Sequence, residues 1–171
     1  MRKIKYTIGI TGSRYLPPNC LFELTAEVRK FYREKAAVHG AANITVLSSI
    51  AEGADTLCAK LALDEGFRLI LPLPMPAMEY RKDFPESAAA EYDKLLSLAD
   101  EVFTAPPDEQ PSESSKRGFW YRQAGLYIVK HSEILLAIWD GVEKDTPDGA
   151  GTWETVKAAR KSGKPIHYVS I

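Results

Sequence analysis

The sequence predicts a single α/β domain with a mainly parallel sheet flanked by helices. Short β-type runs alternate with helical segments, and the runs end in loops rich in glycine, serine and charged residues. This repeated order favours parallel strands joined by right-handed crossovers. With 171 residues, of which 45% are hydrophobic, the chain has the size and apolar content for one such core. We therefore expect residues 1–171 to form one domain.

The first half of the chain contains three β-type runs, and a helical segment follows each of them. The first helix is the clearest, because Leu24, Val28 and Phe31 lie on one face and Gly40 ends it. The helix after the second run is rich in small residues and ends at Gly66. The predicted strands cover residues 6–11, 44–49 and 68–74, and the predicted helices cover residues 21–38, 55–65 and 86–99.

The second half begins with a strand at residues 100–104 and then changes in composition. Residues 105–118 contain Pro106, Pro107 and Pro111 without periodicity, which predicts a mobile loop. This loop either covers a ligand site as a lid or is a surface insertion without such a role. Helices at residues 119–131 and 153–160 and strands at residues 134–140 and 166–169 complete the predicted domain.

Charge and cysteine content exclude several classes of function. The formal net charge is −1, with 22 Lys and Arg against 23 Asp and Glu, so no global basic field attracts nucleic acid. No stretch approaches the roughly 20 apolar residues of a membrane span, and residues 1–5 run into the first strand without a targeting pattern. Cys20 and Cys58 form no CxxC pair or Cys/His cluster. We expect a cytoplasmic protein with reduced thiols, no metal and no membrane partner.

A glycine-rich turn connects the run at residues 134–140 to the last helix and predicts an anion site. Gly149 and Gly151 let the backbone approach a ligand closely. Thr152 adds a hydroxyl at a helix start, where free N–H groups and the helix dipole favour a phosphate. The alternative is a tight turn that needs glycine only for its geometry.

Three further loops lie at the same predicted edge of the sheet, where the ligands of open α/β domains gather. After the first strand, Gly12 and Ser13 offer hydrogen-bond donors, and Arg14 suits a bidentate contact with phosphate. The alternative for this loop is a turn with a solvated arginine. The shared location of the four loops indicates a ligand site more strongly than any one of them.

The second and third loops add acidic, aromatic and basic groups. Ser49, Glu52 and Gly53 follow the second strand, and Glu52 is placed to accept a hydrogen bond from a ribose or a base. We expect Asp55 to cap the next helix. After the third strand, Arg81 lies among aromatic and charged neighbours that suit base stacking or a phosphate clamp, or that begin a surface helix.

The helix at residues 119–131 supplies another candidate ligand residue. Arg122 is placed to contact a phosphate or a sugar, and the alternative is an ion pair within the helix. Gly125, one turn further, permits close packing against a neighbour or a ligand. At the end of the following strand, Asp140 is expected to face the site. No Ser/His/Asp or Cys/His set has the spacing of a nucleophilic centre.

With these motifs in view, the chain resembles the SLOG superfamily, the Rossmann-like group that includes cytokinin-activating phosphoribohydrolases, DNA-processing protein A and many nucleotide sensors. Residues 8–14 are similar to its first Gly-Ser/Thr loop, and residues 48–55 to its Ser-Gly-x-Ala-x-Gly-x-Asp loop, with Ser49 replacing the usual glycine. Residues 121–123 stand near its arginine helix, and residues 149–152 match its Gly-x-Gly-Thr phosphate turn. The resemblance implies a three-layer Rossmann-like domain, a nucleotide-type ligand, no required cofactor and a homo-oligomer.

One departure from the hydrolases of this superfamily concerns catalysis. Their turn ends in a glutamate that works with an arginine of the preceding helix to cleave an N-glycosidic bond. Thr155 stands at that position in this chain, and Glu154 lies one residue earlier, about 100° away on a helix. Arg122 and Glu154 are therefore the catalytic candidates if the chain is a hydrolase.

The sequence leaves four functions open. The first is binding or sensing of a nucleotide or nucleotide derivative by the loops at the carboxyl edge of the sheet. The second is a nucleoside 5′-monophosphate phosphoribohydrolase. Binding of single-stranded DNA and carriage of a molybdenum cofactor follow from the resemblance alone, and the net charge gives nucleic acid no support.

Overall fold

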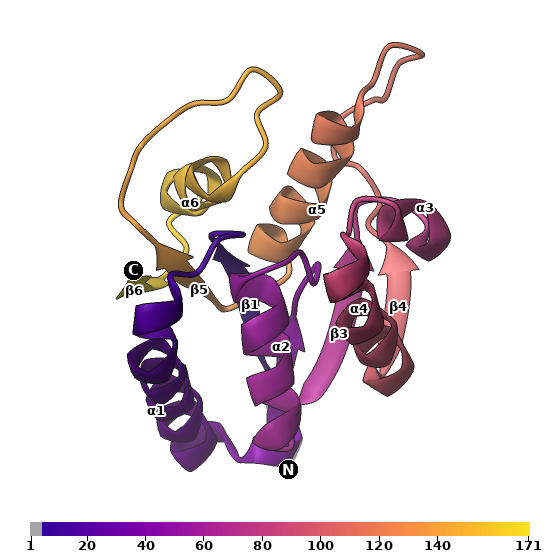
Figure 1. Ribbon diagram of the computed structural model, residues 1–171. Coiled ribbons are helices and arrows are strands. Elements are labelled where there is room, and N and C mark those ends of the chain that lie inside the picture. The colour runs from indigo at the N-terminus through magenta and orange to yellow at the C-terminus, as the bar shows by residue number, and fades with distance from the viewer. Residues whose placement is uncertain (1–4) are drawn as a thin grey trace.

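The computed structural model describes residues 5–171 as a six-stranded sheet with helices on both faces (Figure 1). The strand pairings are all parallel, in the order β4-β3-β2-β1-β5-β6. This sheet confirms the predicted fold class. The segment at residues 1–4, where no targeting pattern was expected, lies outside the described residues. The strands are β1 (Tyr6–Gly12), β2 (Ile44–Leu47), β3 (Arg68–Leu73), β4 (Glu101–Thr104), β5 (Ile134–Trp139) and β6 (Ile166–Ser170).

Helices on the two faces complete a three-layer domain. One face carries α1 (Leu21–His39), α2 (Ala54–Asp64) and α4 (Glu86–Leu98), and the other carries α5 (Arg117–Lys130) and α6 (Thr152–Lys161). A short helix, α3 (Ala77–Arg81), follows β3. None of the helices within residues 5–171 is long and apolar enough to cross a membrane.

The centre of the sheet is buried because helices cover both of its faces. All six residues of β5 are buried, which explains its continuous apolar run. On β1, Ile8 and Ile10 pack into the same core as Val28 and Tyr32 of α1. The chain leaves β1 toward β2 on one side and later returns to β5 on the other, so the carboxyl end of β1 lies at the crevice where parallel α/β domains bind ligands.

Two segments differ from the sequence prediction. The helix α3 lies in a stretch for which a ligand loop was expected and the start of a surface helix was the alternative, and α5 begins at Arg117, two residues before its predicted start. The loop before α5 is tied to that helix, because the N–H groups of Asp108 and Glu109 donate to Oε1 of Gln123 at 2.8 Å and 3.2 Å. The mobility of this loop stays a prediction.

Candidate functional site

Two loops at the carboxyl edge of the sheet touch each other through their backbones. The N–H of Ala54, at the start of α2, donates to the Ser13 carbonyl at 3.0 Å. A Cβ added to Gly12 would lie 2.4 Å from the Cβ of Ala54. One added to Gly53, whose φ is +82°, would lie 2.4 Å from the Arg14 carbonyl oxygen. These glycines therefore allow the first and second loops to form one surface.

The loop after β2 is held in a strained conformation. Ile50 is buried and has a φ of +48°, which a β-branched residue rarely adopts. The Ser48 hydroxyl holds it by accepting from the Ile50 N–H (3.0 Å) and donating to the Asp55 carbonyl (3.1 Å). The Ser49 hydroxyl donates to the Pro72 carbonyl at 2.8 Å. Backbone strain of this kind clusters at ligand sites.

A cavity of about 500 Å³ opens beside these loops, and we call it the edge cavity. The end of β1, the loop after β2, α3, α5 and the turn before α6 all contribute to its wall. Five predicted ligand residues line it, namely Gly12, Arg14, Ser49, Gly151 and Thr152. The wall also contains residues that the sequence did not assign to the ligand site, including Asp55, Tyr80, Arg117, Tyr121 and Thr155.

Arg14 is an exposed cation in the wall of the edge cavity, so its guanidinium is open to solvent. Its guanidinium lies 4.9 Å from the centre of the Tyr121 ring, and it has no ion pair with any of residues 5–171. The other arginines of this range all pair with acids. They are Arg29, Arg33, Arg68, Arg81, Arg117, Arg122 and Arg160.

Asp55 is a buried acid in the same wall. It was expected to cap α2, and that prediction is wrong: Gly53 is the N-cap residue, and no side chain caps the helix. Oδ2 of Asp55 instead accepts from the Ala51 N–H at 3.3 Å. Burial raises the pKa of Asp55 to about 7, although the Ala51 hydrogen bond and the charge of Arg14 oppose this rise. No three His, Cys, Asp or Glu side chains in residues 5–171 are grouped to hold a metal ion.

Contacts between α3 and α5 form another side of the edge cavity. Arg117 pairs with Glu79 at 2.8 Å and with Asp83 at 2.7 Å, and the Tyr121 hydroxyl donates to Asp83. Tyr80, between the two acids, is almost fully buried and points its ring toward Tyr121, with 5.9 Å between the ring centres. The charges of this side are therefore neutralised, and its aromatic rings are fixed in place.

The turn before α6 brings backbone to the cavity wall. Gly151 has a φ of +118°, in the region that favours glycine. The Thr146 hydroxyl donates to the Ala150 carbonyl at 2.6 Å, and the Ala150 N–H donates to Asp148 at 3.2 Å. The ten-residue helix α6 then begins at Thr152. Because the first N–H groups of a helix have no acceptor within it, this part of the wall favours an anion.

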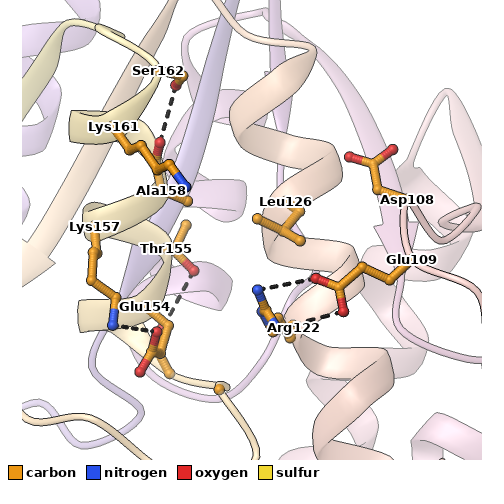
Figure 2. A pocket seen from close by; sticks show the side chains of 12 residues that line it. Asp108, Glu109, Arg122, Leu126, Glu154, Thr155, Lys157, Ala158, Lys161 and Ser162 are labelled. Atoms are coloured by element: carbon orange, nitrogen blue, oxygen red, sulfur yellow. Dashed lines mark hydrogen bonds and ion pairs between the residues drawn. The ribbon is translucent and has the colours of Figure 1, made fainter.

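A second cavity of about 680 Å³ lies between α5 and α6, and we call it the helix cavity (Figure 2). It contains both catalytic candidates, Arg122 and Glu154, together with Gly149. Figure 2 shows Arg122 turned toward Glu109 and Glu154 turned toward Lys157. These two pairs have N–O distances of 3.0 Å and 2.9 Å. Both candidates therefore have partners of opposite charge.

Thr155 lies where the two cavities meet and lines both of them. It packs on Gly125 of α5, where an added Cβ would lie 2.8 Å from the Thr155 hydroxyl oxygen. This agrees with the close packing expected at Gly125. Glu154 lines the helix cavity alone, as its offset of about 100° from position 155 implies. The position to which the resemblance assigns the glutamate of the hydrolases thus lies between the two cavities, and threonine occupies it.

Five predicted ligand residues lie outside the walls of both cavities: Ser13, Glu52, Gly53, Arg81 and Asp140. Arg81 pairs with Asp93 through two contacts of 2.8 Å. The side chains of Ser13 and Asp140 bond to the backbone of their own loops. Glu52 lies in a small recess that it shares with Arg14.

The parallel sheet, its three layers and a cavity at the carboxyl ends of the strands place the domain in the Rossmann-like class. No protein-family model matches the sequence, and no curated protein matches it. Solved structures do match the fold over nearly the whole chain.

The similar structures include DNA processing protein A from Streptococcus pneumoniae, with a TM-score of 0.62 and 18% identity over 96% of this chain. A second match is DNA processing protein A from Helicobacter pylori, whose structure describes its single-stranded DNA binding mode. It has a TM-score of 0.58 and 16% identity over 96% of this chain. TM1055, a structural genomics target, has a TM-score of 0.52 and 15% identity over 94% of this chain. The matches span 50%, 65% and 72% of those chains. The chain therefore has the Rossmann-like fold that these solved structures share with it.

Proposed function

We propose that the edge cavity binds a nucleotide or a nucleotide-derived ligand through its phosphate group. The observation that carries this proposal is the guanidinium of Arg14, which has no ion pair within residues 5–171, in the same wall as the start of α6. A guanidinium gives phosphate a bidentate contact, and the N–H groups at a helix start give it further donors. The Arg14 guanidinium and the N–H groups at the start of α6 can both bind a phosphate without breaking an ion pair between residues 5–171.

The size and composition of the edge cavity support a ligand of nucleotide size. Its volume of about 500 Å³ lies within the range of about 300–1,000 Å³ that small-molecule sites occupy. The rings of Tyr80 and Tyr121 give it an aromatic side, while Gly12 and Gly151 expose backbone. A few polar groups in a partly aromatic wall are typical of sites that orient a base and a phosphate.

A calorimetric titration with nucleoside mono-, di- and triphosphates tests the proposal. Arg14→Ala should weaken binding by about 10- to 100-fold, because a hydrogen bond to a charged group contributes about 1.5–3 kcal/mol. The matched control is Arg33→Ala, since Arg33 is an exposed arginine of α1 that pairs with Glu65. Equal effects of the two substitutions, or no binding by any nucleotide, would contradict the proposal.

A second candidate function is hydrolysis of the N-glycosidic bond of a nucleoside 5′-monophosphate. It is favoured by the meeting of Arg122 and Glu154 in one cavity that adjoins the edge cavity at Thr155. In this reaction Arg122 and Glu154 would assist departure of the base while water attacks the ribose carbon. Release of free base, lost in Arg122→Ala and Glu154→Ala, would establish it. Absence of release at high protein concentration would exclude it.

The fold similarity to DNA processing protein A from Helicobacter pylori, whose structure concerns single-stranded DNA binding, raises a third candidate. A strand would need to neutralise several phosphates, and its binding would weaken steeply with salt. In this chain seven of the described arginines already pair with acids, and the formal net charge is −1. A mobility shift with an oligonucleotide at two salt concentrations separates strand binding from binding of a single nucleotide.

A further inference from the structure

The hydroxyl group of Tyr80 is buried in the wall of the edge cavity without a hydrogen-bond partner in residues 5–171. The residue is 1% exposed. Its ring contacts Phe84, Tyr92 and Tyr121 edge to face, with 5.0 Å, 5.7 Å and 5.9 Å between the ring centres. Three aromatic neighbours keep the phenol from turning toward solvent. Buried hydroxyls normally have a partner, so this one is available to a bound molecule.

The carboxylate of Asp55 is a second incompletely satisfied group in the same wall. Its Oδ2 accepts one long hydrogen bond from Ala51, and Oδ1 accepts none from the described part of the chain. The residue is 8% exposed. It comes from the first turn of α2, whereas Tyr80 comes from α3, so two separate elements bring these oxygens to one cavity.

The position of this pair differs from that of the phosphate contact expected at α6, while Arg14 lies on the side of the cavity nearer to Asp55, since its charge lowers the pKa of that carboxyl. Asp55 follows β2 and Thr152 follows β5, and β1 lies between these strands. Two strand spacings amount to about 10 Å, which is comparable with the distance from a phosphate to the far side of a nucleotide. A carboxylate repels a second phosphate, so the group that it meets is neutral and donates hydrogen bonds.

We infer that Asp55 and Tyr80 form a recognition subsite for an uncharged group with two adjacent hydrogen-bond donors. The inference rests on the proposed function and assigns the part of the ligand beyond its phosphate. Two parts of a nucleotide share this chemistry: the N1–H and 2-amino edge of guanine, and the cis-diol of ribose. The carboxylate accepts from the pair of donors, and the Tyr80 hydroxyl either donates to a neighbouring oxygen or accepts a further N–H.

The test combines ligand binding with the stability of the free protein. Asp55→Asn keeps the side-chain shape and should weaken binding of guanosine 5′-monophosphate at least tenfold, and Tyr80→Phe should weaken it several-fold. Because the Tyr80 hydroxyl is unsatisfied, Tyr80→Phe should leave the melting temperature of the free protein unchanged or raise it. The control is Tyr92→Phe, which removes a 2.8 Å hydrogen bond to the Ala77 carbonyl and should lower the melting temperature without altering binding.

Three ligands distinguish the two sources of the donor pair. Recognition of the guanine edge predicts weaker binding of inosine 5′-monophosphate, which lacks the 2-amino group. Recognition of the diol predicts weaker binding of 2′-deoxyguanosine 5′-monophosphate and little preference among bases. In either case the difference should disappear in Asp55→Asn.

Two results would overturn the inference in distinguishable ways. If Arg14→Ala weakens nucleotide binding while Asp55→Asn and Tyr80→Phe leave it unchanged, the subsite is wrong and the proposed function stands. If neither the nucleotides nor inorganic phosphate stabilise the wild-type protein, both the subsite and the proposed function are wrong. A lower melting temperature of free Tyr80→Phe would show that the hydroxyl has a structural partner, which also contradicts the subsite.

Discussion

The helix cavity and the edge cavity adjoin at Thr155 but differ in how their charged groups are satisfied. In the helix cavity, Arg122 pairs with Glu109 and Lys157 pairs with Glu154, while the exposed Lys161 has no ion pair within residues 5–171. Exposed pairs of this kind contribute about 0–1 kcal/mol each to stability, and they leave little net charge for a ligand to meet. The larger of the two cavities therefore resembles an ordinary groove between two helices.

The edge cavity has the opposite character. Within residues 5–171, the exposed Arg14 has no ion pair and the buried Tyr80 hydroxyl has no hydrogen-bond partner, and burial raises the pKa of Asp55. Buried polar groups of this kind destabilise a protein unless something else satisfies them, and they concentrate at functional sites. Buried polar groups without partners are therefore a better guide to the candidate ligand site than cavity volume.

The largest expected effect comes from Asp55→Asn. Burial raises the pKa of this carboxyl from 3.8 to about 7, and Arg14, Tyr80 and Cys58 are the titratable groups that interact with it. An acid with a raised folded-state pKa stabilises the fold while it is protonated. This contribution is complete below about pH 4 and is lost as the pH rises through about 7. At pH 8 the variant should therefore be more stable than the wild type, by up to about 4 kcal/mol.

Urea denaturation at pH 4 and pH 8 measures this difference. The two proteins should differ little near pH 4, where the wild-type carboxyl is protonated in the folded state and only about half ionised in the unfolded state. Asp64→Asn is a control, because Asp64 is an exposed acid that pairs with Arg29. A pH-independent difference between Asp55→Asn and the wild type would contradict the raised pKa.

Two glycine substitutions compare the packing at the edge of the sheet with that of the helix cavity. Their expected effects on the free energy of unfolding are smaller than that of Asp55→Asn. Gly53→Ala should lower the free energy of unfolding by about 3 kcal/mol. The alanine would have an unfavourable φ, and its Cβ would clash with the Arg14 backbone. Gly149→Ala has a similar φ of +68°, but its Cβ meets only the flexible side chain of Arg122, at 2.9 Å. It should cost about 1 kcal/mol. Equal losses in urea denaturation would show that the edge of the sheet is no more tightly packed than the helix cavity.

The smallest expected effect is that of Arg122→Ala. Loss of its pair with Glu109 should lower stability by about 0–1 kcal/mol. Affinity for a nucleotide should stay within about twofold of the wild type, since no contact with the ligand is lost. Calorimetric titration of both variants, Arg122→Ala and Arg14→Ala, with the same nucleotide compares their affinities. A larger loss of affinity in Arg122→Ala would place the ligand in the helix cavity.

The sequence predicted the sheet well because its strands carry strong local signals. β5 reads as a continuous apolar run, as a strand buried on both faces must, and Gly151 with Thr152 marks the start of α6. The short helix α3 was only the alternative to a loop, since five residues after two prolines show no periodicity. Its existence depends on packing against α4 and α5, which the sequence does not display.

Side-chain direction decides which of the predicted site residues line the edge cavity. Arg14 follows directly from its place after β1, but neighbouring residues on a helix point about 100° apart. Tyr80 therefore lines the edge cavity while Arg81 pairs with Asp93. The sequence predicted that Asp55 caps α2. Its carboxylate instead turns back to a loop N–H, and only the folded backbone brings that N–H near.

The most direct test of the ligand site is a crystal structure of the full chain with a bound nucleoside 5′-monophosphate. We expect density in the edge cavity, with the phosphate between Arg14 and the first turn of α6. The rest of the ligand should extend toward Asp55 and Tyr80. Density confined to the helix cavity, against Arg122 and Glu154, would contradict the assignment of the edge cavity as the ligand site.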